Sequence, residues 1–303
     1  MRIPARGTAL GAVALATVLL SAVTGCSSGS DDGGGGSQLL SGLGNLAGDS
    51  STKQVSFLDV AAVRKLGKGD PKRFTSISEP SSVMLSPHEP SPLGAQFRVS
   101  QIDTAVDTDE AGHWKGSFDA SAITKSLTRE GYTRSEKDGQ EVWRRPEGSG
   151  PSLHVAENEI SYSLRDSDPM SAVDPEDGSS LADNKEFRRA AECLEDVYRA
   201  DFNPLSSSNP VRLAALGQQA SSAAKNTEVL CFVVKDDAAA QDLEAELQSV
   251  VRDESPKFDG TKVTVEKGDQ PVVRAVVPDT AAQRPGRLIL TDMELWMAAA
   301  ADR

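Results

Sequence analysis

Apolar residues recur every three or four positions in several stretches of the chain, which is the spacing of an amphipathic helix. The clearest stretch is 119–131, where Ile123 and Leu127 share one face. Asp119 can cap its first turn, and Gly131 suits a left-handed C-terminal position. We expect further helices at 56–67, at 187–198, after Asp236 or Asp237, and after a capping box at 291–294.

Shorter runs rich in Val, Ile and aromatic residues predict β-strands. The Asp-Gly pair at 138–139 lies between two such runs and predicts a hairpin. The run 229–234 is apolar on both faces, which is typical of a central strand. The expected strands are 96–106, 114–118, 132–136, 141–145, 152–156, 160–164, 229–234, 262–266, 272–277 and 287–290.

These elements predict an α+β fold of two loosely similar lobes, each a mostly antiparallel sheet with packed helices. The acidic stretch 166–180 contains Pro169, Pro175 and Gly178 and marks the boundary between the lobes. The first lobe is therefore expected at 53–170 and the second at 180–303. We expect any groove at their junction, because clefts favour such interfaces.

The first 52 residues follow a different pattern. Two arginines precede an apolar run at 8–24 that is too short for a comfortable membrane span, which predicts a signal peptide at 1–25. Ser, Gly and Asp dominate the stretch that follows. A segment so poor in apolar area cannot offset the entropy cost of ordering, so 26–52 is predicted to be a disordered tether.

The apolar run closes with Val23-Thr24-Gly25-Cys26, which resembles a bacterial lipobox. Together with the stretches GSFD at 116–119, GYT at 131–133 and GQEVW at 139–143, it resembles uncharacterised lipoproteins of actinobacteria. In that family the cysteine receives diacylglycerol and the signal is cut before it. The resemblance implies lipid attachment at Cys26 and a place at the outer face of the cytoplasmic membrane. An ordinary secretory signal with an incidental cysteine is the alternative.

The chain is acidic, with a formal net charge of −13. Cleavage before Cys26 would remove Arg2 and Arg6 and bring the charge to −15. Acid repels phosphate, so nucleic acid is not an expected partner. Aromatic residues make up 5% of the chain, which is sparse for a glycan-binding surface. We expect the tryptophans and tyrosines in the core, namely Trp114, Trp143, Trp296, Tyr132 and Tyr162.

If Cys26 is acylated, Cys193 and Cys231 remain as an even pair. In an oxidising compartment such a pair is expected to form a disulfide, and two free buried thiols are the alternative. The bridge would join the helix at 187–198 to the strand at 229–234.

One short motif is typical of a class of enzymes. Ser222-Ala223-Ala224-Lys225 matches S-x-x-K, which places a nucleophile and a lysine on one helix face in penicillin-recognising enzymes. The companion motifs S-D-N and K-T-G are missing from the sequence, so a polar helix end or loop is the ordinary interpretation.

Metal sites are weakly indicated. The histidines His88, His113 and His154 stand far apart, which argues against zinc. A calcium loop starting at Asp107 would have Phe118 where the twelfth position requires Glu. No cofactor is expected.

The sequence thus predicts a lipid-anchored envelope lipoprotein, attached to the membrane through Cys26. Its domain is expected to be a non-enzymatic module that binds an unknown ligand or envelope protein. The alternatives are an envelope serine hydrolase or acyl-enzyme using Ser222 and Lys225, and an importer-associated substrate-binding protein. The importer class expects parallel sheets, which the strand-rich pattern disfavours.

Overall fold

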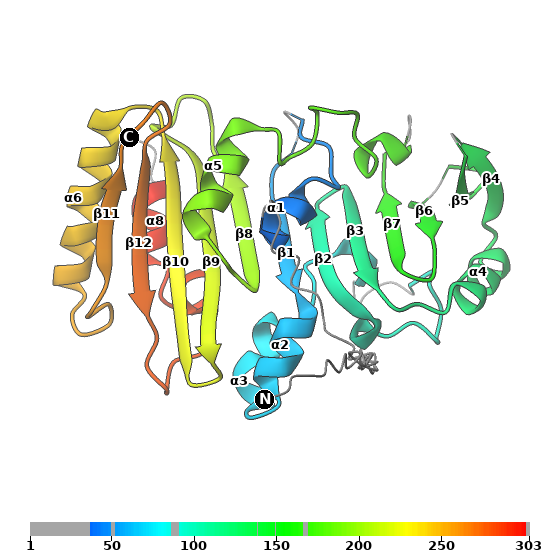
Figure 1. The fold of residues 1–303 in the computed structure, drawn as a ribbon, viewed down its shortest axis with the longest axis horizontal. Helices are drawn as coiled ribbons and strands as arrows, with labels where there is room; N and C mark the ends of the chain where they lie inside the picture. The colour runs from blue at the N-terminus through cyan, green and yellow to red at the C-terminus, as the bar shows by residue number, and fades with distance from the viewer. Residues whose placement is uncertain are drawn as a thin grey trace, which may run out of the picture. The chain divides into compact units, whose positions relative to one another are not determined.

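The structure is a computed structural model that describes residues 37–300, apart from 50–51, 86–90, 138, 149 and 166–168. These residues form an α+β fold built on one twelve-stranded antiparallel sheet (Figure 1). The strand order is β11-β12-β10-β9-β8-β1-β2-β3-β7-β6-β5-β4. The predicted fold class is confirmed.

The strands are β1 Val55–Asp59, β2 Ile102–Thr108, β3 Ala111–Gly116, β4 Thr133–Lys137, β5 Gln140–Arg144, β6 Ser152–Val155, β7 Glu159–Ser163, β8 Arg199–Pro204, β9 Val211–Ser222, β10 Lys225–Val234, β11 Lys262–Glu266 and β12 Val272–Pro278. The helices are α1 Gln38–Leu43, α2 Val60–Gly67, α3 Pro71–Phe74, α4 Ala120–Arg129, α5 Lys185–Leu194, α6 Asp237–Asp253, α7 Arg287–Leu290 and α8 Glu294–Ala300.

The two halves of the chain share this sheet. Each half begins with three consecutive strands that pair in an antiparallel way, and a helix follows the third strand. The last strand of each half then pairs with the third strand of that half: β7 pairs with β3, and β12 pairs with β10. The first strands of the halves, β1 and β8, pair with each other, with Phe57 opposite Ala200. The two predicted lobes are therefore halves of one continuous sheet.

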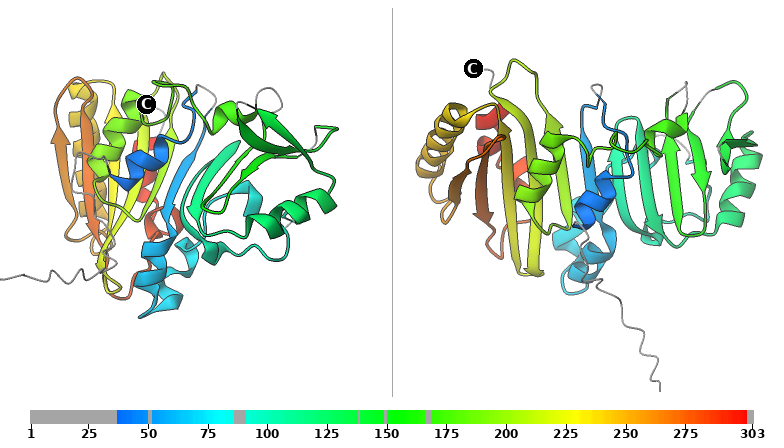
Figure 2. Two further views of the ribbon diagram at one scale, coloured as in Figure 1. Left: turned by 45° about the vertical axis from the view of Figure 1, so that its right-hand side comes forward. Right: turned by 45° about the horizontal axis from the view of Figure 1, so that its top comes forward.

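Helices cover both faces of the sheet (Figure 2). On one face α1 and α5 pack over the middle strands in a single core that spans both halves. On the other face α2, α3 and α4 cover the first half, and α6, α7 and α8 cover the second. Strand β10 contributes side chains to the cores on both faces of the sheet. Val229 and Cys231 face α5, whereas Leu230 and Phe232 face the α6 side.

A disulfide joins Cys193 of α5 to Cys231 of β10, as the sequence predicts. The two residues are 38 positions apart. A crosslink that closes a loop of this length stabilises a fold by roughly 4 kcal/mol in the chain-entropy account. The bridge fixes α5 to the centre of the sheet.

The predicted tether at 26–52 is wrong where the structure describes it. Ser37 caps helix α1, whose Leu39 and Leu43 are at most 1% exposed. Leu46 is buried in the same core. Three leucines at this spacing supply an apolar face that the segment's average composition conceals. Residues 26–36 and 50–51 of the predicted tether lie outside the described part of the chain.

The predicted helix at 56–67 begins later than expected. Residues up to Asp59 form β1, whose Phe57 and Leu58 are buried on opposite faces of the sheet. Helix α2 starts at Val60, and Asp59 rather than Ser56 caps it, with Oδ1 2.7 Å from the backbone nitrogen of Ala62.

Other elements also differ from the sequence prediction in their bounds or their type. The helix expected to reach residue 198 ends at Leu194, and β8 and β9 follow it. Glu195 has a φ of +60°, which stops the helix although apolar residues continue at Val197 and Tyr198. The strand expected at 287–290 is the short helix α7. The strand expected from residue 96 begins at Ile102.

None of the helices within the described ranges is long and apolar enough to cross a membrane.

Candidate ligand groove at the junction of the halves

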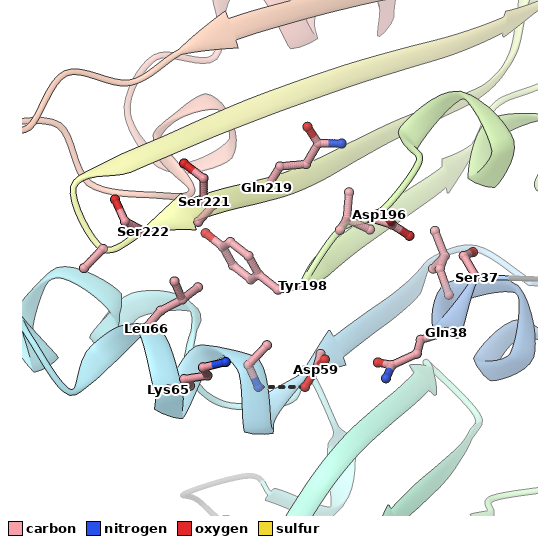
Figure 3. A pocket seen from close by; sticks show the side chains of 15 residues that line it. Ser37, Gln38, Asp59, Lys65, Leu66, Asp196, Tyr198, Gln219, Ser221 and Ser222 are labelled. Atoms are coloured by element: carbon pink, nitrogen blue, oxygen red, sulfur yellow. Dashed lines mark hydrogen bonds between the residues drawn. The ribbon is translucent and has the colours of Figure 1, made fainter. Parts of the chain in front are cut away.

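A groove of about 740 Å³ lies where β1 ends and β8 begins (Figure 3). This is the junction at which the sequence places any groove. Four segments line it: the start of α1, helix α2 with the residue that caps it, the segment leading into β8, and the end of β9 with the turn that follows. The lining residues are Ser37, Gln38, Leu39, Asp59, Ala62, Lys65, Leu66, Asp196, Val197, Tyr198, Gln219, Ala220, Ser221, Ser222 and Ala223.

The groove exists because neighbouring strands stop at different points. The pairing of β8 with β9 begins at Arg199 opposite Gln218, whereas β9 continues to Ser222. Strand β1 ends at Asp59 and turns into α2. Beside the last residues of β9 the sheet therefore has a notch, with α2 rather than a strand across from it.

The edge of β9 that borders the notch has a definite orientation. The backbone N–H of Tyr198 donates to the carbonyl of Gln218 at 2.9 Å, so the main chain of Gln218 faces β8. Main-chain groups alternate sides along a strand, so those of Ala220 face the same way, into the groove. Gln219 pairs on the other side, with Thr227 of β10.

The side chains of the groove are of mixed chemistry. Lys65 and Leu66 lie toward the end formed by the β9–β10 hairpin, and Asp196 lies toward the end formed by α1 (Figure 3). Asp59 lies between α2 and Tyr198 and is half-buried. Burial raises the pKa of the Asp59 carboxyl, although its hydrogen bond to Ala62 opposes that shift.

The floor of the groove belongs to a buried polar network. The Tyr198 hydroxyl lies 2.6 Å from Oδ1 of Asn226 and 2.9 Å from Oε1 of Gln218. Asn226 donates to Asp279, and Arg287 donates to the other oxygen of Asp279. Burial raises the pKa of Tyr198 far above its usual value, so the phenol stays protonated. The contacts with Asn226 and Gln218 hold the Tyr198 ring in place at the base of the groove.

The S-x-x-K motif does not form a helix face. Ser222 and Lys225 are opposite each other at the end of the β9–β10 hairpin, and both are exposed. The serine lines the groove, whereas the lysine side chain is exposed and is not among the lining residues. The helix end or loop expected at this position is a strand hairpin.

The described histidines and acidic residues do not assemble a metal site. No group of three potential ligands among His, Cys, Asp and Glu occurs within the described ranges. His113 is buried and its Nδ1 lies 2.9 Å from Oγ of Ser161. Burial lowers the pKa of His113 to about 4, so its ring is neutral near pH 7. His154 contacts the backbone carbonyl of Glu141, and His88 lies outside the described residues.

Asp107, where a calcium loop would have to start and where a solvated acidic loop is the expected structure, is a buried residue of β2. Its Oδ1 accepts hydrogen bonds from Nε1 of Trp114 at 2.9 Å and from the hydroxyl of Tyr162 at 2.7 Å. Because Tyr162 donates its single proton to Asp107, Ser82 donates to Tyr162 across 2.6 Å. Burial raises the pKa of Asp107 to about 6. A second cavity, of about 410 Å³, opens beside this carboxylate.

Most of the tryptophans and tyrosines that were expected in the core lie there. Trp114, Trp143, Tyr132 and Tyr162 are buried, whereas Trp296 of α8 is partly exposed and packs against the core of the second half.

Cys26, the expected lipid-attachment residue, lies outside the described residues. No family model matches the chain, and neither a curated protein nor a solved structure gives a match.

Proposed function

We propose that this chain is a lipid-anchored extracytoplasmic binding protein whose ligand occupies the groove at the junction of the halves. The observation that carries the proposal is the groove itself, which lies at an interface of two similar halves and has a volume in the range of ligand pockets, about 300–1,000 Å³. The lipobox-like sequence ending at Cys26 supports the anchor. Two acyl chains suffice to hold a protein stably at a membrane.

The polar side chains of the groove favour binding over catalysis. Asp59 caps α2, and Tyr198 is held in the buried network. Ser222 faces an exposed lysine across a hairpin. Among the groove residues that the structure describes, no nucleophile lies within hydrogen-bond distance of a base, which nucleophilic catalysis requires.

The anchor and the groove are close in sequence. Ten residues, 27–36, lie between Cys26 and Ser37, so eleven Cα-to-Cα steps connect Cys26 to the rim of the groove. A chain of this length spans at most about 36–40 Å. An acylated Cys26 would therefore hold the groove near the membrane surface, where the ligand is expected to be presented.

A groove-filling variant tests the proposal. Ser221→Trp places an indole at the exposed groove residue Ser221, and Ser207→Trp makes the same change at an exposed loop outside the groove. The full chain would be purified from its native membranes, and the molecules released on denaturation identified by mass spectrometry. We expect a compound that accompanies the parent and Ser207→Trp and is reduced at least tenfold in Ser221→Trp, because the indole occupies its space.

Two outcomes would contradict this proposal. One is the same set of released molecules from all three proteins, which would remove the groove as the binding site. The other is labelling by a fluorophosphonate that is lost in Ser222→Ala, which would replace binding by acyl-enzyme chemistry at Ser222.

A further inference from the structure

The edge of β9 in the groove differs from the outer edges of the sheet. Natural proteins protect exposed strand edges with charged side chains, because unpaired main-chain groups attract other strands. The outer strands of the sheet follow this rule: charged residues in β4 are Arg134, Glu136 and Lys137, and in β11 they are Lys262 and Glu266. The stretch 219–223 is Gln-Ala-Ser-Ser-Ala and carries no charge.

The groove also leaves room for a strand. It continues the line of β8, which begins at Arg199, and it lies between the edge of β9 and helix α2. The walls carry small side chains at Ala62, Ala220 and Ala223, so another main chain can approach closely. The N–H and C=O of Ala220 face this space, because they lie two residues beyond Gln218, whose carbonyl binds Tyr198.

The charges of the groove are unequal. Asp59 and Asp196 both line it, and Lys65 is the one basic side chain among the lining residues that the structure describes. Asp59 is half-buried, so its carboxylate is incompletely solvated. A cationic group beside it would recover part of that lost solvation.

We infer that the groove binds an extended polypeptide segment, which pairs through its main chain with Ala220 of β9 and places a lysine or arginine side chain near Asp59 and Asp196. This inference rests on the proposed function of the groove and names the chemistry of its ligand. Addition of a peptide strand to an exposed sheet edge is an established mode of recognition, in which main-chain hydrogen bonds supply affinity and side-chain pockets supply specificity.

The main-chain contact can be removed with little change elsewhere. Ala220→Pro deletes the N–H that faces the groove, and proline is tolerated where a strand edge is unpaired. Ala220→Ser keeps the N–H and changes the side chain by one hydroxyl. The probe is a phage-displayed random heptapeptide library, selected on the full chain in detergent micelles. Synthetic versions of the selected peptides are then measured by fluorescence anisotropy.

We expect the selected peptides to contain Lys or Arg and to bind Ala220→Ser within about threefold of the parent. Ala220→Pro should lose on the order of tenfold in affinity, the equivalent of one net hydrogen bond. Methylating alternate peptide nitrogens tests the same contact with the protein unchanged: one set of N-methylated peptides should lose binding and the complementary set should keep it.

The inference would be overturned if the selected peptides bound Ala220→Pro as tightly as the parent and if both N-methylated sets bound the parent as tightly as the unmethylated peptides do. A selection that yields no binder would overturn it too. These failures are distinguishable from failure of the proposed function. A ligand that Ser221→Trp excludes and Ala220→Pro retains would leave the groove as a binding site and exclude strand addition.

Discussion

Asp107 is buried and hydrogen-bonded in the fold, which the sequence around it does not reveal. The sequence shows an acidic run at 103–110 and suggests a solvated loop or a calcium ligand. In the fold, Asp107 lies on the face of β2 that α2, α3 and α4 cover, and Trp114 and Tyr162 both donate to it. Gly112 is required beside it, because a Cβ there would lie 2.4 Å from Asp107 Oδ1.

The raised pKa of Asp107 predicts a pH-dependent loss of stability. The folded-state pKa is about 6, above the ordinary 3.8, so the folded protein binds this proton more tightly than the unfolded chain does. The stability that the group contributes is present below about pH 4 and is lost as pH rises toward 6. Asp107→Asn keeps an acceptor for both donors and removes the titration.

We therefore expect the free energy of unfolding of Asp107→Asn to increase relative to that of the parent as the pH rises from 4 to 7. This increase should be up to about 3 kcal/mol, since two pKa units correspond to that amount. Urea unfolding at a series of pH values measures it, and the difference between the two proteins cancels the titration of other groups. A difference that is constant with pH would refute the assignment.

At the scale of elements, the sequence predicts helix ends and turns correctly where a capping or turn residue marks them. Asp119 and Asp236 cap α4 and α6 as the sequence indicates, each accepting from a backbone nitrogen three residues later. The hairpin of β4 and β5 has the expected position, and Gly131 has the expected positive φ of 84°. These features depend on neighbouring residues, which a sequence displays directly.

Strand β8 was not predictable in the same way. Its Arg199 and Asp201 interrupt the apolar pattern, yet both are buried, because they pair with each other at 2.8 Å. That partnership is visible in three dimensions and not in the hydrophobic periodicity. The same holds for the notch beside β9, which depends on where β1 and β8 stop.

Helix α1 supports a prediction about the segment that the sequence assigned to the tether. Leu43 is fully buried in the core that α1 and α5 share. Leu43→Ala should lower the free energy of unfolding by about 2–5 kcal/mol, the usual range for a buried leucine. Ser41→Ala, on the exposed side of the same helix, is the matched control and should change it by less than about 0.5 kcal/mol. Equal values for both variants would mean that α1 does not pack as described.

At the scale of the whole molecule, the pairing of β1 with β8 joins two similar halves into one sheet and leaves the groove at their junction. The sequence supports two similar α+β halves and a junction between them. It does not reveal that the halves share a sheet, because pairing of β1 with β8 connects residues about 140 positions apart, well beyond the reach of local pattern.

The central proposal is that acylation of Cys26 holds this groove at the membrane. Its most direct test is radiolabelled palmitate incorporation and membrane fractionation of the parent and of Cys26→Ser, which replaces the acceptor sulfur by a hydroxyl. We expect the parent to incorporate label and to sediment with membranes. Cys26→Ser should incorporate none and appear in the soluble fraction. A parent without label, together with a variant that sediments with membranes equally well, would contradict the proposal.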